Sequence, residues 1–109
     1  MAAAREWLAR RGDTTAVLCD DDVIAAGMLA AAQADGVDVP RELSVIGFDD
    51  LDLTRLTFPA LTTVATDPEG LGAAAFELLH ARLQGKRLHN RVLPVGLVVR
   101  ASTAPALRK

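Results

Sequence analysis

The stretch Ser44-Val45-Ile46-Gly47-Phe48-Asp49-Asp50 decides the fold of this chain. Its apolar run is typical of a strand buried on both faces, as in a parallel sheet covered by helices. Gly47 within the run indicates either a close approach by another backbone or a kink near the strand end. Asp49 and Asp50 then lie beyond the carboxyl end of the strand, where open α/β sheets place their ligand sites.

A second stretch repeats this design. Residues 15–19 form a predicted strand that ends in the acids Asp20-Asp21-Asp22, and a helix is predicted from about Asp22 to Ala34. A strand, a helix and a strand in this order form a βαβ unit, so the two strands should be parallel with a right-handed crossover. Two strands that deliver carboxylates to one edge of a sheet are therefore the organising feature of the sequence.

The remaining elements flank this unit. Helices are predicted over residues 2–11 and 68–84, a helical turn over 51–56, and strands over 61–65 and 92–100, with Pro94 confining part of the last to an edge or a break. The sequence Asp67-Pro68-Glu69 is a strong helix start, because an aspartate can cap the helix and proline suits its first position. We expect Asp22 to cap the preceding helix in the same way.

Composition excludes several classes of protein. The chain has 109 residues, of which half are hydrophobic, and a net charge of −2 without a basic run. This segment itself is therefore not expected to bind nucleic acid. A single cysteine, Cys19, excludes an internal disulfide framework and a cysteine-built zinc site. Since no apolar run approaches the ~20 residues of a membrane span and no signal peptide is recognisable, we expect a soluble cytoplasmic α/β protein.

Five stretches, in this order and spacing, carry a resemblance to a known family. They are Ala16–Asp22 with Ala25 and Gly27, Gly36–Pro40, Leu43–Asp50, Pro59–Val64, and Leu97–Thr103. Together they resemble the effector-binding region of the LacI/GalR family of bacterial transcription regulators, whose fold is that of periplasmic sugar-binding proteins. The resemblance covers nearly the whole chain.

The resemblance implies a fold and an organisation. The expected fold class is α/β, a Rossmann-like parallel sheet with flanking helices that is the C-terminal fragment of a two-lobed, periplasmic-binding-protein-like fold. Residues 1–66 would belong to the C-terminal effector-binding lobe, 67–95 would be a helix and strand of the N-terminal lobe, and 96–109 would be the return strand and tail. Family members bind a small-molecule effector, most often a sugar, act as homodimers or larger assemblies, and bind operator DNA through an N-terminal domain that this chain lacks. No cofactor, metal or membrane partner is implied.

The resemblance also implies effector-binding residues. Asp49 matches an aspartate that accepts hydrogen bonds from effector hydroxyls, a task that suits an ionised carboxylate because it is acceptor-only. Asp21 stands where the family usually has an asparagine, and Thr66 stands where a glutamine is frequent, so both are departures. Phe58 is a candidate for the lining of the cleft, although a single phenylalanine is more often part of a core.

Three rival interpretations remain open. A receiver-type domain would use acids at strand ends to bind Mg²⁺ and accept a phosphoryl group, but it also needs a lysine that does not follow a strand here. A periplasmic-type solute-binding protein shares the fold. An enzyme is not expected, because the sequence contains no nucleophile–base pair, glycine-rich phosphate loop or metal cluster, and we therefore expect no catalytic residues.

Overall fold

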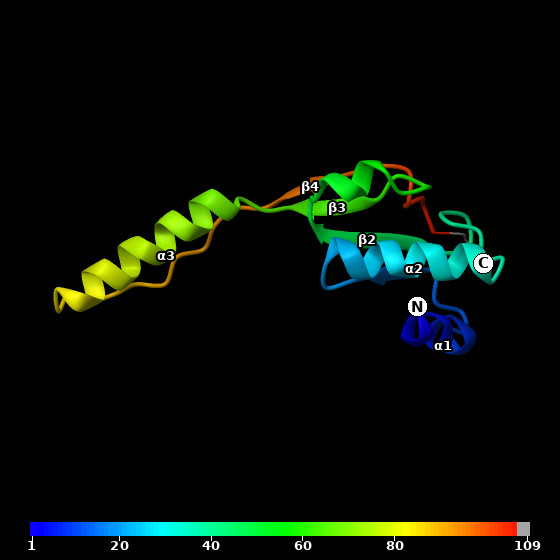
Figure 1. Cartoon of the computed structure of the whole chain (residues 1–109), viewed down its shortest axis with the longest axis horizontal. Coiled ribbons are helices and arrows are strands. Elements are labelled where there is room, and N and C mark those ends of the chain that lie inside the picture. Colours follow the sequence, from blue (N-terminus) through cyan, green and yellow to red (C-terminus); the bar gives the residue numbers. More distant parts are fainter. Residues whose placement is uncertain (107–109) are drawn as a thin grey trace.

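The computed structural model describes residues 1–106, which fold into a mixed α/β arrangement (Figure 1). The helices are α1 (Ala2–Arg10), α2 (Asp22–Ala34) and α3 (Pro68–Leu83), with a short 3₁₀ helix, η1 (Asp52–Arg55). The strands are β1 (Ala16–Leu18), β2 (Ser44–Asp49), β3 (Thr62–Ala65) and β4 (Gly96–Val98).

The four strands form one sheet in the order β1-β2-β3-β4. β1 pairs with β2 in parallel, and β2 pairs with β3 in parallel, with Gly47 opposite Thr63 and Asp49 opposite Ala65. β4 is antiparallel to β3, so the sheet is mixed only at this edge. The predicted parallel βαβ unit is confirmed.

The core lies between the sheet and α2. The helix packs along β2, and α1 packs on the other side of α2 (Figure 1). On the face of the sheet toward α2, the β2 residues Val45 and Gly47 are buried. On the opposite face of the sheet, Leu18 of β1 is exposed, and Ile46 and Phe48 of β2 are half-buried. Small residues on α2 allow the close approach, since Ala25, Ala31 and Ala32 are completely buried.

The residue that caps the start of α2 differs from the expected one. The N-cap of α2 is Asp21, whose carboxylate accepts a hydrogen bond from the Ile24 amide, 2.6 Å away. The expected cap, Asp22, is instead the first helical residue, and its carboxylate points into the sheet rather than back along the helix. The N-cap of α3 is Asp67, which accepts a hydrogen bond from the Gly70 amide.

The last predicted strand is shorter than expected. Of residues 92–100, only Gly96–Val98 pair with β3, and Val92 is 93% exposed. Pro94 has no amide proton to donate to a ladder, so the pairing begins after it. The preceding segment runs back alongside α3 (Figure 1), where Arg91 forms an ion pair with Glu77.

The C-terminal segment is bonded to the amino-terminal ends of β2 and β3. The Val45 amide donates to the carbonyl of Ser102, and the Ser102 hydroxyl donates to the carbonyl of Val45, 2.6 Å away. The Thr62 amide donates to Ser102 Oγ. Ser102 is fully buried, and this one residue therefore satisfies backbone groups of two strands.

α3 projects away from the rest of the molecule, giving it dimensions of 57 × 27 × 24 Å (Figure 1). Its leucines and phenylalanine are largely uncovered: Leu71, Phe76, Leu79 and Leu83 are all at least 59% exposed, and Ala74 is its one buried residue. Within the described part of the chain, no helix combines the length and apolar character needed to cross a bilayer.

Candidate functional site

The candidate site lies at the carboxyl-terminal edge of the three parallel strands. β1 is followed by Cys19-Asp20-Asp21, β2 ends at Asp49, and β3 is followed by Thr66. Because the strands run in the same direction, these residues share one edge, as the sequence predicted for Asp21 and Asp49. Open α/β sheets bind their ligands in this position.

Asp49 occupies the end of β2, between β1 and β3. Its φ is 106° and that of Asp50 is 56°, both in the region that favours glycine. Within residues 1–106, no group donates a hydrogen bond to the Asp49 carboxylate, and the residue is exposed. Both of its oxygens are therefore available to accept hydrogen bonds from a ligand.

The Asp50 carboxylate, unlike that of Asp49, has a partner within the protein, the guanidinium of Arg100. Arg100 Nη2 lies 2.7 Å from Asp50 Oδ1, and its other terminal nitrogen, Nη1, donates to the Thr54 hydroxyl and the Leu61 carbonyl. The hydrogen bond from Arg100 is the main reason why the pKa of Asp50 lies below its ordinary value. This pair ties the segment after β2 to the segment after β4.

Asp21 uses one of its two carboxylate oxygens in a hydrogen bond within the protein. One of its oxygens caps α2, and the residue is half-buried. Neighbouring Cys19 is buried, and burial raises the pKa of its thiol, with a further contribution from the carboxylates of Asp21 and Asp20. Asp20 itself is exposed.

Asp22 is fully buried and uses both oxygens within the protein. Oδ2 accepts a hydrogen bond from the Leu51 amide at 2.7 Å, and Oδ1 accepts one from the Thr63 hydroxyl at 2.5 Å. This carboxylate therefore has no free acceptor for a ligand. Its hydrogen bonds act on other residues of the site instead.

Thr66 lies at the same edge as Asp49. Ala65 pairs with Asp49 in the β2–β3 register, so Thr66 is the next residue along the neighbouring strand. It is half-buried. The structure thus brings three of the four predicted effector-binding residues together: Asp21, Asp49 and Thr66.

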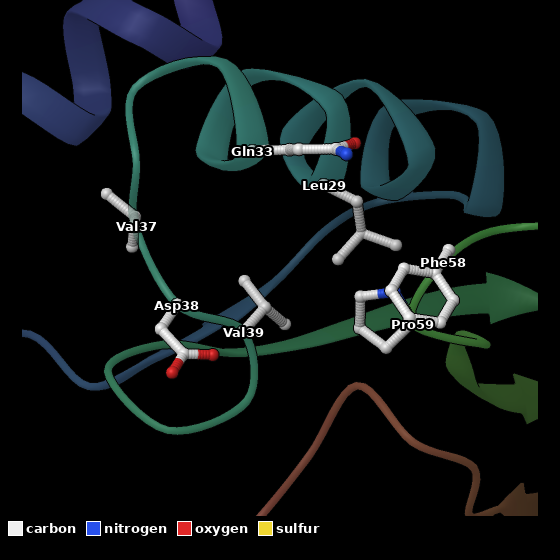
Figure 2. Close-up of a pocket in the computed structure, with 7 residues that line it drawn as sticks. All are labelled: Leu29, Gln33, Val37, Asp38, Val39, Phe58 and Pro59. Carbon is white, nitrogen blue, oxygen red and sulfur yellow. The ribbon is translucent and has the colours of Figure 1, made fainter.

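Phe58 is not at this edge. It precedes β3, near the amino-terminal ends of the strands, and its side chain is 88% exposed. It borders a separate cavity of about 150 Å³, in which Leu29, Val39 and Pro59 face one another beside the Phe58 ring (Figure 2). The expectation that Phe58 lines the same cleft as Asp49 is therefore not met by its position.

The sequence did not predict three features of the site. These are the hydrogen bond from Thr63 to Asp22, the pairing of Arg100 with Asp50, and the burial of Asp22. Gly47 carried a signal for Asp22, because a glycine inside a strand predicts a close approach. The group that approaches is Asp22, whose Cα lies 3.2 Å from where a Cβ on Gly47 would be. Arg100 lies in the stretch Leu97–Thr103 that carries part of the family resemblance, but nothing in that stretch predicts its pairing with Asp50.

The chemistry of this edge is that of hydrogen-bond acceptors. Exposed carboxylate oxygens suit a neutral ligand that presents several hydroxyl donors. In the described part of the chain, no group of three or more His, Cys, Asp or Glu side chains is placed to hold a metal ion.

Comparisons with known proteins agree on one group of relatives. The family model for periplasmic binding protein-like domains matches residues 1–103. The repressor CytR of Escherichia coli K12 is 42% identical over 91 residues, which are 82% of this chain and 27% of the repressor. The chain thus spans less than a third of this curated relative.

Solved structures share the fold over nearly the whole chain. The Lac repressor dimer, bound to operator and the anti-inducer ONPF, superposes with a TM-score of 0.81 at 32% identity, covering 94% of this chain and 36% of that one. A LacI family regulator from Arthrobacter sp. FB24, in complex with lactose, has a TM-score of 0.75 at 36% identity, covering 94% and 40% respectively.

Proposed function

Because the chain belongs to the family of periplasmic binding protein-like domains, we propose that it is the effector-binding part of a LacI-family transcriptional regulator. The observation that carries the proposal is Asp49, an exposed acid at the end of the central parallel strand whose carboxylate receives no hydrogen bond within residues 1–106. Such a group is ready to accept hydrogen bonds from effector hydroxyls.

The proposed effector is a sugar or a related compound with several hydroxyl groups. Asp49 would accept from two adjacent hydroxyls, and Asp21 and Thr66 would contact the same molecule from the neighbouring strands. The Arthrobacter regulator that resembles this chain binds lactose, which supports a sugar. Phe58 is left outside the proposed site because it lies near the opposite edge of the sheet.

The whole protein would bind operator DNA through a separate N-terminal domain, as a homodimer in the cytoplasm. The similar Lac repressor structure is a dimer bound to operator. Residues 1–66 would belong to the C-terminal lobe, 67–95 to the N-terminal lobe, and 96–109 to the return strand and tail. The exposed leucines of α3 support this division, because a lobe that is largely missing would cover them. The relatives are repressors rather than enzymes, and we propose no catalytic role.

This proposal is tested by Asp49→Ala in the full-length protein. Wild type is first titrated calorimetrically with lactose, cellobiose and a panel of monosaccharides and nucleosides. Removing a carboxylate that accepts two hydroxyl donors should weaken the binding of a compound from this panel by roughly 10²–10³-fold. Affinity for an operator selected by the wild-type protein from random DNA should stay the same.

Asp20→Ala is the matched control, because Asp20 is an exposed acid at the same edge that is not among the proposed effector-binding residues. It should leave the affinity unchanged. An Asp49→Ala protein that binds and responds like wild type would contradict the proposal, as would a wild-type protein that binds no compound of the panel.

A further inference from the structure

The buried carboxylate of Asp22 joins three elements at the candidate site. It belongs to the first turn of α2, accepts a hydrogen bond from the Leu51 amide between β2 and η1, and accepts another from the Thr63 side chain on β3. Both donors are neutral, so the negative charge is stabilised by these hydrogen bonds and by the amino-terminal end of the helix.

The two groups that Asp22 contacts act on the residues directly after Asp49. Leu51, whose amide donates to Asp22, is two positions further along the chain. The Asp50 amide donates to the Thr63 hydroxyl, which in turn donates to Asp22. Consecutive amides on the far side of Asp49 are thus held by one network.

The backbone at this point needs such support. Positive φ at two consecutive aspartates is an unfavourable backbone conformation, and such conformations persist only where the surroundings impose them. The Asp49 backbone pairs with β3 opposite Ala65, but its exposed side chain forms no hydrogen bond within residues 1–106 and so contributes nothing to holding the turn. The restraint comes from the Asp22 network on one side and Arg100 on the other.

Gly47 gives Asp22 the space it occupies. A methyl group at this position would overlap Asp22 Oδ1 and would lie 3.0 Å from a methyl carbon of Leu61. Both neighbours are in the buried layer between α2 and the sheet. Only glycine at this position of β2 lets the carboxylate reach Leu51 and Thr63 together.

We propose that Asp22 is a positioning residue for effector binding, which holds the turn of Asp49 and Asp50 so that the Asp49 carboxylate is aimed at the effector. The role rests on the proposed function of Asp49. Asp22 contacts no effector itself. Asp22 also links the turn to β3, the strand that leads out to α3.

The test measures the turn and the binding site separately in the full-length protein. Hydrogen–deuterium exchange is followed by mass spectrometry on peptides that cover residues 46–56. Asp22→Ala should raise exchange of the Asp50 and Leu51 amides about tenfold or more, because the Leu51 amide loses its acceptor and the Thr63 hydroxyl, which accepts from the Asp50 amide, loses the partner that orients it. The affinity for lactose, or for the compound of the panel that binds wild type most tightly, should fall about tenfold or more.

Two variants separate positioning from general stability. Asp22→Asn should restore most of both properties, because its oxygen can accept from Leu51 while its amide donates to Thr63 Oγ1. Leu43→Ala, at a fully buried core position near the other end of β2, should destabilise the domain as a whole without a selective effect on the turn. Thr63→Val, which is nearly isosteric, takes the place of Asp22→Ala if that variant does not fold.

Unchanged exchange at Asp50 and Leu51 in Asp22→Ala and Thr63→Val would overturn the inference. A loosened turn with unchanged affinity would also overturn it, because the carboxylate would then need no positioning. If no compound of the panel binds wild type, the proposed function fails, and the exchange data alone still decide whether Asp22 holds the turn.

Discussion

Four aspartates at or near the turn after β2 differ in how many of their oxygens the protein itself uses. Asp22 uses both, Asp50 is bound by Arg100, Asp21 uses one in a helix cap, and Asp49 uses none. A carboxylate is useful to a ligand only where its acceptors are free. Chemically identical side chains at one edge of the sheet therefore have separate roles, set by their neighbours.

Arg100→Gln should show what the Asp50 pair contributes. The pKa of Asp50 is lowered in the folded protein, so the pair stabilises the fold above the pKa of an unfolded aspartate, about 3.9, and this stabilisation is lost as pH falls through the lower folded value. Removing a mostly buried guanidinium that makes three hydrogen bonds, two to side chains and one to a carbonyl, should cost about 2–3 kcal/mol at pH 7.

Urea unfolding at pH 7 and pH 3 checks this, and the difference between wild type and Arg100→Gln should shrink at the lower pH. The control is Arg55→Gln, which breaks the exposed pair with Asp52 and should change the unfolding free energy by less than about 0.5 kcal/mol. A cost for Arg100→Gln that is equal at both pH values would show that the arginine acts through its packing and its hydrogen bonds to Thr54 and Leu61 rather than through the charge of Asp50.

At the scale of elements, α2 connects the core to the site. Its alanine-rich face packs on β2, and its amino-terminal end supplies Asp21 and Asp22 to the edge where the strands end. The helix start therefore lies at the candidate site, and the same residue, Asp21, caps the helix and is a proposed effector-binding residue.

The two tasks of Asp21 can be separated by substitution. Asp21→Asn should keep the unfolding free energy within a few tenths of a kcal/mol, because asparagine caps helices about as well as aspartate, whereas Asp21→Ala should cost about 1 kcal/mol. Denaturant unfolding measures both. Since asparagine also donates hydrogen bonds, Asp21→Asn should shift the preference among sugars without loss of stability; an equal loss of stability in both variants would argue against the cap.

At the scale of the whole molecule, α3 stands apart from the sheet on two extended connections. β3 leads out to it and β4 leads back (Figure 1), and its apolar residues remain exposed. Exposed apolar surface of this kind promotes association. The proposed covering is the rest of the N-terminal lobe.

The 109-residue chain alone should therefore self-associate through α3. Replacing Leu71 and Leu79, which are 61% and 59% exposed, by glutamate should shift it toward monomer in sedimentation velocity experiments. Arg82→Glu, an exposed change of charge on the same helix, should not have this effect. A monodisperse, cooperatively folding monomer of the unsubstituted chain would contradict the assignment of 67–95 to another lobe.

Much of the fold follows from local patterns in the sequence. Apolar runs that end in acids predicted the parallel βαβ unit, and Asp67-Pro68-Glu69 predicted the start of α3, because periodicity and capping act between residues close along the chain. The resemblance to LacI/GalR-family regulators is confirmed by the relatives and the solved structures. The effector-binding roles of Asp49, Asp21 and Thr66 stay predictions.

Other features were decided only by the tertiary structure. The burial of Asp22 against Gly47 and Thr63, which leaves Asp21 as the cap of α2, and the pairing of Asp50 with Arg100 depend on residues far apart in the sequence. The position of Phe58 away from Asp49 depends on the path of the chain between β2 and β3. The sequence by itself determined the elements and the edge where the acids collect. Only the packing of α2, β3 and the C-terminal segment around the end of β2 decided which carboxylate stays free, because that depends on which donors lie within hydrogen-bonding distance.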